Sequence, residues 1–310
     1  MKPAAFDYVA PRTVAEAVAA LGNADGKSQV LAGGQSLLLE MHLERIRPDL
    51  VVDINRIPEL DDMRVVDDTL RVGALIRHQV FESAQAVPGP LGSLFSLAVV
   101  NIAHPPIRSR GTMVGSFGWG HPASEWCAIA VALDAEIQLQ GREGARTVAA
   151  RDYFHGPLKT ARRPGELITS VHYPLLADQT GVGFIEHRRT HFCFAQVAVA
   201  AALTVHAGVI SEARIGLVNC ADRPLRAHAA EQALIGVEIG PPVEGYRVPE
   251  EHPFARAGRI AAEQDAAPVA EPYADLEYRR HAIAVVTART LCQAANDHPS
   301  RTSESKGGGQ

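Results

Sequence analysis

A glycine-rich segment between residues 111 and 120 constrains this chain more than any other part of its sequence. The segment has four glycines in ten residues: Gly111, Gly115, Gly118 and Gly120. Because glycine loses the most backbone entropy on ordering, this density disfavours both a regular helix and a good strand. We therefore predict a specialised loop over residues 108–122, with regular elements on both sides of it.

A second glycine turn lies near the beginning of the chain. An apolar run that is typical of a buried strand leads into Gly33-Gly34, and a helical pattern begins at Ser36. Backbone amides in such a turn, next to a helix N-terminus, can hold a phosphate oxygen. The glycine-rich segment offers a similar concavity with hydroxyl groups, built from Thr112, Gly115 and Ser116. Together the two turns are predicted to clamp one dinucleotide.

The usual nucleotide-binding motifs do not explain these turns. Neither turn matches GxGxxG, and the chain has no GxxxxGK[ST], so an ordinary Rossmann or nucleoside-triphosphate site has no fingerprint. Nicotinamide is therefore disfavoured as the tightly held cofactor. Either turn alone is typical of plain turn geometry, and only the pair favours a cofactor site.

The composition disfavours several other classes of protein. The 310 residues carry 30 basic and 35 acidic side chains and a formal net charge of -5. This balance, without a dense Lys/Arg block, disfavours nucleic acid as a partner. No apolar run approaches the roughly 18 residues of a membrane span, and the N-terminus does not resemble a leader. We expect a cytoplasmic protein of about two domains.

Metal chemistry is also disfavoured. The four cysteines, Cys127, Cys193, Cys220 and Cys292, lie far apart and form no CxxC pair, so a zinc or iron–sulfur site cannot be built locally. His187 and His191 would lie on one face of a helix, but the segment lacks the Glu of HExxH and a third ligand. We interpret them as hydrogen-bonded or exposed side chains and predict no metal site and no catalytic side chain.

Ionisable side chains around the glycine-rich segment are candidate ligand contacts. His121 lies where a ligand would pass. Arg108 and Arg110 flank the segment and could either meet phosphate or stay in solvent. Glu125 begins the following helix, where an acid suits the helix dipole but could also bind a sugar-like chain.

Taken together, these segments resemble the flavin-binding medium subunit of molybdenum hydroxylases, the group of carbon monoxide dehydrogenase and xanthine dehydrogenase. The first turn resembles this family over residues 31–37 and 52–60, and the second over 108–116 and 122–125. Further similarity extends the resemblance to about residue 292, through segments 153–156, 165–168, 194–197, 221–224 and 277–280.

The resemblance implies an α+β fold, with a vanillyl-alcohol-oxidase/p-cresol-methylhydroxylase-type FAD-binding domain followed by a smaller sheet-plus-helix C-terminal domain. We expect the FAD-binding domain over residues 1–176, with two subdomains split near residue 58. The C-terminal domain is expected over 177–292, and residues 293–310 as a disordered tail.

The resemblance also implies the residues that contact FAD. The two turns would hold the diphosphate, Glu125 would meet the ribityl chain, and Phe194 matches an aromatic residue near the isoalloxazine. The full set is Leu31, Ala32, Gly33, Gly34, Gln35, Ser36, Leu37, Leu38, Ile102, Thr112, Gly115, Ser116, Glu125, Leu167, Ile168, Glu186 and Phe194.

Four positions depart from the family pattern. Val114 replaces the first of two usual glycines, and His121 replaces a frequent Asp. Glu186 stands where some members have Lys, and Cys193 replaces a common Asp. We expect these changes to affect the polarity around the flavin and its redox potential. They do not remove the clamp formed by the two turns.

By this resemblance, the chain is an FAD-containing electron-transfer subunit of a molybdenum hydroxylase. It would take electrons from iron–sulfur clusters of a small partner subunit and deliver them to an external acceptor. A large molybdopterin subunit would oxidise the substrate, in a dimer of heterotrimers. Two alternatives remain open, a noncatalytic scaffold subunit and a stand-alone flavin oxidase.

Overall fold

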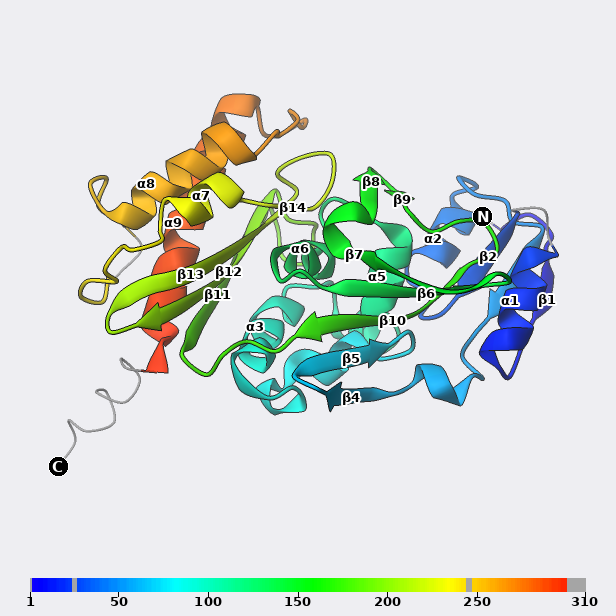
Figure 1. The fold of residues 1–310 in the computed structure, drawn as a ribbon. Helices are drawn as coiled ribbons and strands as arrows, with labels where there is room; N and C mark the ends of the chain where they lie inside the picture. Colours follow the sequence, from blue (N-terminus) through cyan, green and yellow to red (C-terminus); the bar gives the residue numbers. More distant parts are fainter. Residues whose placement is uncertain (1, 24–26, 244–246, 300–310) are drawn as a thin grey trace. The chain divides into compact units, whose positions relative to one another are not determined.

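The structure is a computed structural model that describes residues 2–23, 27–243 and 247–299. The predicted disorder of the last residues falls on 300–310, which lie outside the described residues. The chain forms two compact units (Figure 1). Unit 1 combines Met1–Val80, His104–Gly120 and Asp134–Pro174, and unit 2 combines Phe81–Ala103, His121–Leu133 and Leu175–Gln310.

Unit 1 begins with a three-stranded parallel sheet in the order β1-β3-β2. Its strands are β1 (Asp7–Val9), β2 (Ser28–Leu31) and β3 (Leu50–Asp53). Helix α1 (Val14–Gly22) buries Ala17, Val18 and Leu21, and the Thr13 hydroxyl caps it by accepting from the Glu16 N–H at 3.2 Å. The strand predicted before the first glycine turn is confirmed as β2.

A five-stranded antiparallel sheet forms the larger part of unit 1, in the order β4-β5-β10-β6-β7. Alternate residues such as Val72, Ile137 and Val171 are fully buried in its core. A short hairpin, β8–β9, precedes the central strand β10. The bounds are β4 (Met63–Val66), β5 (Thr69–Gly73), β6 (Glu136–Gly141), β7 (Gly144–Ala149), β8 (Phe154–Gly156), β9 (Lys159–Thr160) and β10 (Leu167–Pro174).

The glycine-rich segment is helical, so the predicted loop over 108–122 is wrong. Residues Pro105–Arg108 form α4 and Met113–Trp119 form α5, whereas α2 (Leu37–His42) follows the first glycine turn. The Thr112 hydroxyl caps α5 by accepting from the Gly115 N–H at 3.0 Å. Burial of Met113, Val114 and Phe117 offsets the backbone entropy that the glycines lose. The helix ends at Gly120, whose φ of 65° suits glycine.

Unit 2 contains a four-stranded antiparallel sheet in the order β11-β12-β13-β14. Strand β12 pairs on both sides, with β11 and with β13. The bounds are β11 (Thr180–His187), β12 (Val197–His206), β13 (Val209–Val218), β14 (Leu225–Arg226), α7 (His228–Gln232), α8 (Pro253–Ile260) and α9 (Leu276–Asp297).

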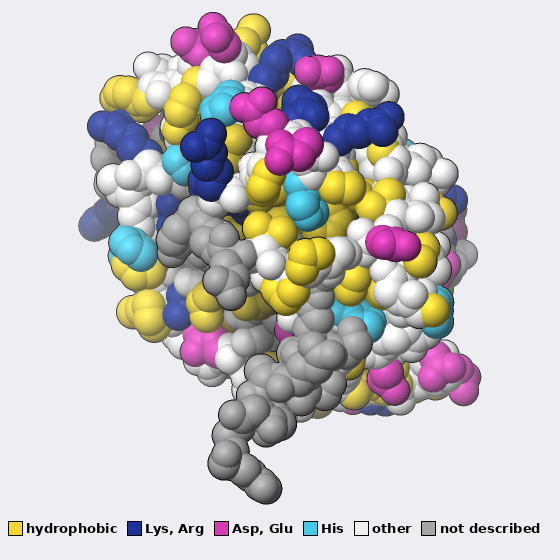
Figure 2. Space-filling model, turned by 90° about the vertical axis from the view of Figure 1, so that its left-hand side faces the viewer, with side chains coloured by type: hydrophobic (Ala, Val, Ile, Leu, Met, Phe, Trp, Pro, Cys, Tyr) yellow, Lys and Arg dark blue, Asp and Glu magenta, His cyan; other side chains and the backbone are white. Residues whose placement is uncertain are grey.

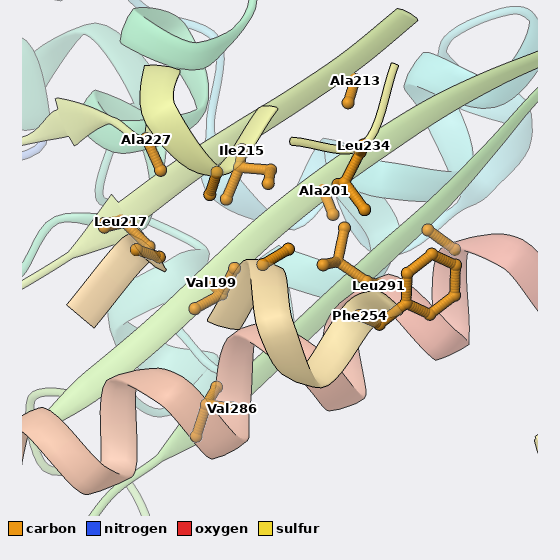
Figure 3. Close-up of a cluster of buried hydrophobic side chains, with 14 of the residues drawn as sticks. Val199, Ala201, Ala213, Ile215, Leu217, Ala227, Leu234, Phe254, Val286 and Leu291 are labelled. Atoms are coloured by element: carbon orange, nitrogen blue, oxygen red, sulfur yellow. The ribbon is translucent and has the colours of Figure 1, made fainter. Parts of the chain in front are cut away.

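Helices α8 and α9 cover the sheet of unit 2. Figure 3 shows Val199 and Ile215 from the sheet, Phe254 from α8 and Leu291 from α9 in one buried cluster. Two glycines of β11 allow α9 to approach the sheet closely. A Cβ atom on Gly181 would lie 2.0 Å from the Ala294 carbonyl oxygen.

Two helices from earlier in the chain complete unit 2. They are α3 (Gly89–Val99), which contacts β11, and α6 (Glu125–Ala132), which contacts β13. Phe81, Phe95 and Trp126 form an aromatic cluster with ring centroids 5.2–5.4 Å apart. The helix predicted to begin at Glu125 is thus confirmed.

The predicted helical face with His187 and His191 is wrong. His187 is in a strand because β11 pairs with β12 along its whole length, up to this residue. Residues 188–196, which include His191, are irregular. The imidazole Nε2 of His187 lies 2.6 Å from the Tyr278 hydroxyl. His187 is therefore hydrogen-bonded, as one of the two interpretations expected.

Candidate functional site

Both glycine turns line one cavity of about 680 Å³ within unit 1. The first turn and α2 contribute Ala32, Ser36 and Leu37, and helix α5 contributes Gly115 and other residues. The volume lies in the range of cofactor pockets, which is about 300–1,000 Å³. Segments that are far apart in the sequence thus form one binding space.

The two turns are in direct backbone contact. A Cβ atom built on Gly33 would lie 2.3 Å from the carbonyl oxygen of Arg110 and 2.6 Å from the Cα of Gly111. No side chain fits at this position without moving one of the turns. Gly111 is equally confined, since its Cβ would lie 2.7 Å from Cδ2 of His78. Glycine is therefore required for packing at both places.

A polar bridge between Asn55 and Arg77 also joins the turns. The side-chain amide of Asn55 donates to the Ala32 carbonyl at 2.8 Å, and Arg77 Nη2 donates to Asn55 Oδ1 at 2.7 Å. Through Nη1, Arg77 also donates to the Arg110 carbonyl. Sequence reasoning did not single out these two residues, although Asn55 lies in a segment that resembles the family.

The predicted contacts in unit 1 differ in their relation to the cavity. Ala32, Ser36, Leu37, Gly115, Leu167 and Ile168 line it. Ser36 precedes α2 and makes no side-chain capping hydrogen bond. Thr112 acts as a helix cap and engages the Gly115 N–H. The other predicted residues of the two turns, Leu31, Gly33, Gly34, Gln35, Leu38, Thr112 and Ser116, belong to the same segments but are not among the lining residues.

Another part of the cavity wall was missed by sequence reasoning. It is formed at and next to the β8–β9 hairpin by His155, Leu158, Lys159, Thr160 and Arg162. Trp119 at the end of α5 also lines the cavity. The sequence contained a feature that could have indicated this wall. Basic residues cluster directly after Tyr153-Phe154-His155-Gly156, a segment that resembles the family.

The four remaining predicted contacts, Ile102, Glu125, Glu186 and Phe194, belong to unit 2. Glu125 is 7% exposed, and the side chain of Glu186 is 1% exposed. Burial and, after it, the nearby charge of Glu186 together raise the pKa of Glu125 to about 8. Burial also raises the pKa of Glu186 to about 7, against the opposing effect of Arg188. The two carboxyl groups can therefore hold a proton near neutral pH.

Arg188 connects this carboxyl pair to the loop after α3. Its Nη1 lies 3.4 Å from Glu186 Oε1 and donates to the Asn101 carbonyl at 3.1 Å, next to Ile102. The other carboxylate oxygen of Glu186, Oε2, is buried without a hydrogen bond among the described residues. Three of the four predicted contacts in unit 2 are thus brought close to Arg188 or to its hydrogen-bond partners.

Phe194 is held by an aromatic stack. Phe194 is 57% exposed, and its ring stacks on the imidazole of His121, with centroids 4.7 Å apart and an angle of 17° between the planes. The Ala123 N–H donates to Nδ1 of His121 at 3.1 Å. Since Nδ1 accepts a hydrogen bond, the imidazole proton is on Nε2. His121, which departs from the family pattern, therefore positions Phe194.

The described residues set limits on other kinds of site. In residues 2–23, 27–243 and 247–299, no group of three or more His, Cys, Asp or Glu side chains could hold a metal ion. Within these ranges, no helix is long and apolar enough to cross a membrane. On the face drawn in Figure 2, Lys and Arg side chains lie next to Asp and Glu side chains, so this face has no continuous basic stripe.

Comparison with known families agrees with this geometry. Residues 4–176 match the FAD binding domain in molybdopterin dehydrogenase, and residues 184–294 match the CO dehydrogenase flavoprotein C-terminal domain. The caffeine dehydrogenase subunit beta of Pseudomonas sp. (strain CBB1) is 37% identical over 77% of this chain and 81% of its own. The carbon monoxide dehydrogenase medium chain of Afipia carboxidovorans is 32% identical over 95% and 98%.

Solved structures show the same relationship. The carbon monoxide dehydrogenase of Hydrogenophaga pseudoflava matches with a TM-score of 0.86 and 32% identity, over 96% of this chain and 100% of that one. The expected α+β fold, an FAD-binding domain followed by a smaller C-terminal domain, is confirmed. This chain belongs to the FAD-binding subunits of molybdenum hydroxylases, the oxidoreductase family of carbon monoxide dehydrogenase and xanthine dehydrogenase.

Proposed function

We propose that the chain is the electron-transfer subunit of its complex, which passes electrons from iron–sulfur clusters of a partner through FAD to an external acceptor. The observation that carries this proposal is the single cavity lined by both glycine turns, with Gly33 packed on the backbone of Arg110. When bound, FAD supplies the capacity to accept and release electrons. The protein positions the cofactor and sets the charge around it.

The residues of unit 1 fit a dinucleotide. The cavity combines apolar side chains such as Leu37 and Ile168 with the hydroxyl group of Ser36 and with basic side chains. Pockets for cofactors have this composition, a mostly apolar lining with a few polar groups that fix orientation. We propose that segments 31–38 and 112–116 hold the diphosphate.

From the family resemblance, we propose that Ile102 lies near the flavin or adenine rings, that Glu125 meets the ribityl chain and that Phe194 lies near the isoalloxazine. Glu186 is proposed as a further contact of the cofactor. The domain boundaries follow the same reasoning, with the FAD-binding domain over 1–176 and the C-terminal domain over 177–292. In this arrangement Glu186 places a carboxyl group where some members have a lysine. The Arg188 guanidinium next to it would then supply the positive charge.

The partners are inferred from the relatives. Those relatives are named as single subunits of larger enzymes, a medium chain of carbon monoxide dehydrogenase and a subunit beta of caffeine dehydrogenase. We propose a large molybdopterin subunit that oxidises the substrate and a small iron–sulfur subunit, assembled as a dimer of heterotrimers in the cytoplasm. The final acceptor is a soluble oxidant such as NAD or oxygen.

Reconstitution with FAD tests this proposal. The purified full chain is expected to acquire a yellow flavin spectrum, and the bound nucleotide released by denaturation should be FAD. The Gly33→Val chain should lose the flavin. The isolated chain should turn over no substrate, whereas reduced iron–sulfur partner should reduce its flavin. A chain that binds no FAD would favour the scaffold, and substrate turnover by the chain alone would favour a flavin oxidase.

A further inference from the structure

The β8–β9 hairpin and the residues just after it form a separate wall of the FAD cavity. His155, Lys159 and Arg162 line the cavity from this segment, which belongs to neither glycine turn. No role follows for them from the two turns. Their position raises the question of what this wall adds to cofactor binding.

The hairpin is fixed to helix α5. The N–H of Leu158 donates to the Gly120 carbonyl at 3.2 Å, and Leu158 has a positive φ of 57° at the tip. A Cβ atom on Gly120 would lie 2.7 Å from Cγ2 of Thr160. The rings of Phe154 and Phe117 lie 6.0 Å apart beneath the hairpin. The hairpin therefore has a defined position next to the second glycine turn.

The ionisable side chains that line the cavity differ in how they are paired. Glu40 is the acidic one, and its Oε1 lies 3.3 Å from Arg45 Nη1. Arg162 Nη1 donates to the backbone carbonyl of Glu166 at 3.0 Å, and this carbonyl carries no net charge. For Lys159, the described residues provide no hydrogen bond or ion pair. The positive charge of the cavity is therefore concentrated at the hairpin.

The glycine turns cannot supply this charge. Their backbone amides are neutral, and several of them already have partners within the chain. The Gly115 N–H donates to Thr112 at 3.0 Å, and the Leu38 N–H donates to the Gly34 carbonyl at 3.1 Å. A diphosphate carries two negative charges, and hydrogen bonds between ionised groups are the strong ones. A cation next to the turns would strengthen the binding of this charge, and the hairpin provides one.

We propose that the β8–β9 hairpin is a cationic clamp, in which the Lys159 ammonium binds the diphosphate of the dinucleotide and Arg162 provides a second positive charge. This inference rests on the proposed function, since it concerns the same cofactor. It assigns to Lys159 the selection of a phosphorylated flavin over a neutral one.

Flavin titrations of the full chain test the clamp. Lys159→Ala is expected to weaken FAD binding about 10- to 100-fold, the usual effect of losing a hydrogen bond to a charged group. Riboflavin has no phosphate, so its affinity should be the same for the wild type and for Lys159→Ala. Lys159→Arg should retain most of the FAD affinity. Lys27→Ala is the matched control, because Lys27 is paired with Asp49 at 3.3 Å on the surface of unit 1.

Chemical modification provides a readout that does not depend on a variant. Acetic anhydride, followed by mass spectrometry, should acetylate Lys159 in the free chain and much less in the presence of FAD. Riboflavin should give no such protection, and Lys27 should react equally in all samples.

The outcomes separate this inference from the proposed function. A wild-type chain that binds no FAD would contradict the function itself. If the wild type binds FAD but Lys159→Ala binds it equally well, or FAD leaves the acetylation of Lys159 unchanged, the clamp is wrong and the cofactor assignment stands.

Discussion

The α carbon of Gly33 faces the carbonyl oxygen of Arg110 so closely that a β carbon would lie 2.3 Å from it. Gly33→Ala must therefore separate the two glycine turns. Overpacking of this kind typically costs about 1–3 kcal/mol of unfolding free energy. We expect a lower urea midpoint and weaker FAD binding, measured by denaturant unfolding and by flavin titration.

The control for this variant is Gly118→Ala in helix α5. A Cβ on Gly118 would meet only Cδ1 of Ile168, at 3.8 Å, an ordinary contact. Alanine favours a helix over glycine by about 0.5–1 kcal/mol, so this variant should be more stable than the wild type. Equal destabilisation by both changes would show that the contact between the turns is not the cause.

Thr112→Ala removes the cap of helix α5. The Gly115 N–H loses its acceptor, and the loss of such a cap costs about 1 kcal/mol. A calorimetric scan should show a decrease in Tm of about 2–4 °C. Thr112→Ser keeps the hydroxyl oxygen and should restore most of the stability. If serine is as damaging as alanine, the methyl group rather than the cap is responsible.

The buried carboxyl pair predicts a loss of stability with rising pH. Folding raises the pKa of Glu125 from 4.5 to about 8 and that of Glu186 from 4.5 to about 7. The folded chain therefore holds more protons than the unfolded chain between these limits, and stability falls as pH rises through this interval. Urea midpoints from pH 5 to 8 should show the slope.

Glu125→Gln should reduce that slope, because glutamine cannot ionise. A residual slope is expected from Glu186, which keeps its buried carboxyl group, and from Glu231, whose pKa burial also raises. The exposed Glu263 provides the control, since Glu263→Gln should leave the slope unchanged. An unaltered slope in Glu125→Gln would mean that the pair is already charged in the folded protein.

His78 predicts the opposite pH dependence of stability, a loss of stability as the pH falls below neutral. Burial, together with the charges of Arg108 and Arg77, lowers its pKa from 6.5 to about 3. The unfolded chain then binds the proton more readily, so stability falls as pH decreases from 6.5 toward 3. Relative to its own stability at pH 7, His78→Gln should lose less at pH 5 than the wild type in urea unfolding. The exposed His206 serves as control, through His206→Gln.

The fate of the glycine-rich segment shows where sequence reasoning fails. Glycine density predicted a loop, yet Thr112 caps a helix and Met113, Val114 and Phe117 are buried on it. The cap residue was visible in the sequence. The burial that stabilises the helix depends on packing within the folded unit, and no local pattern reports it.

Other parts of the site could be predicted from the sequence to different degrees. The turn at Gly33 could be identified because a strand and a helix flank it in sequence. The hairpin wall with Lys159 could not, since its place depends on the contact between Leu158 and Gly120, 38 positions apart. Likewise, nothing local indicated that Asn55 and Arg77 join the two turns.

The interleaving of the two units has a consequence for making the protein. Helices α3 and α6 are synthesised early but pack on β11 and β13, which lie after residue 179. A recombinant fragment that stops at residue 176 would leave the apolar faces of both helices exposed, and it should aggregate. On the ribosome, the same helices remain without their packing partners until β11 and β13 have been synthesised, so we expect chaperones to bind this region.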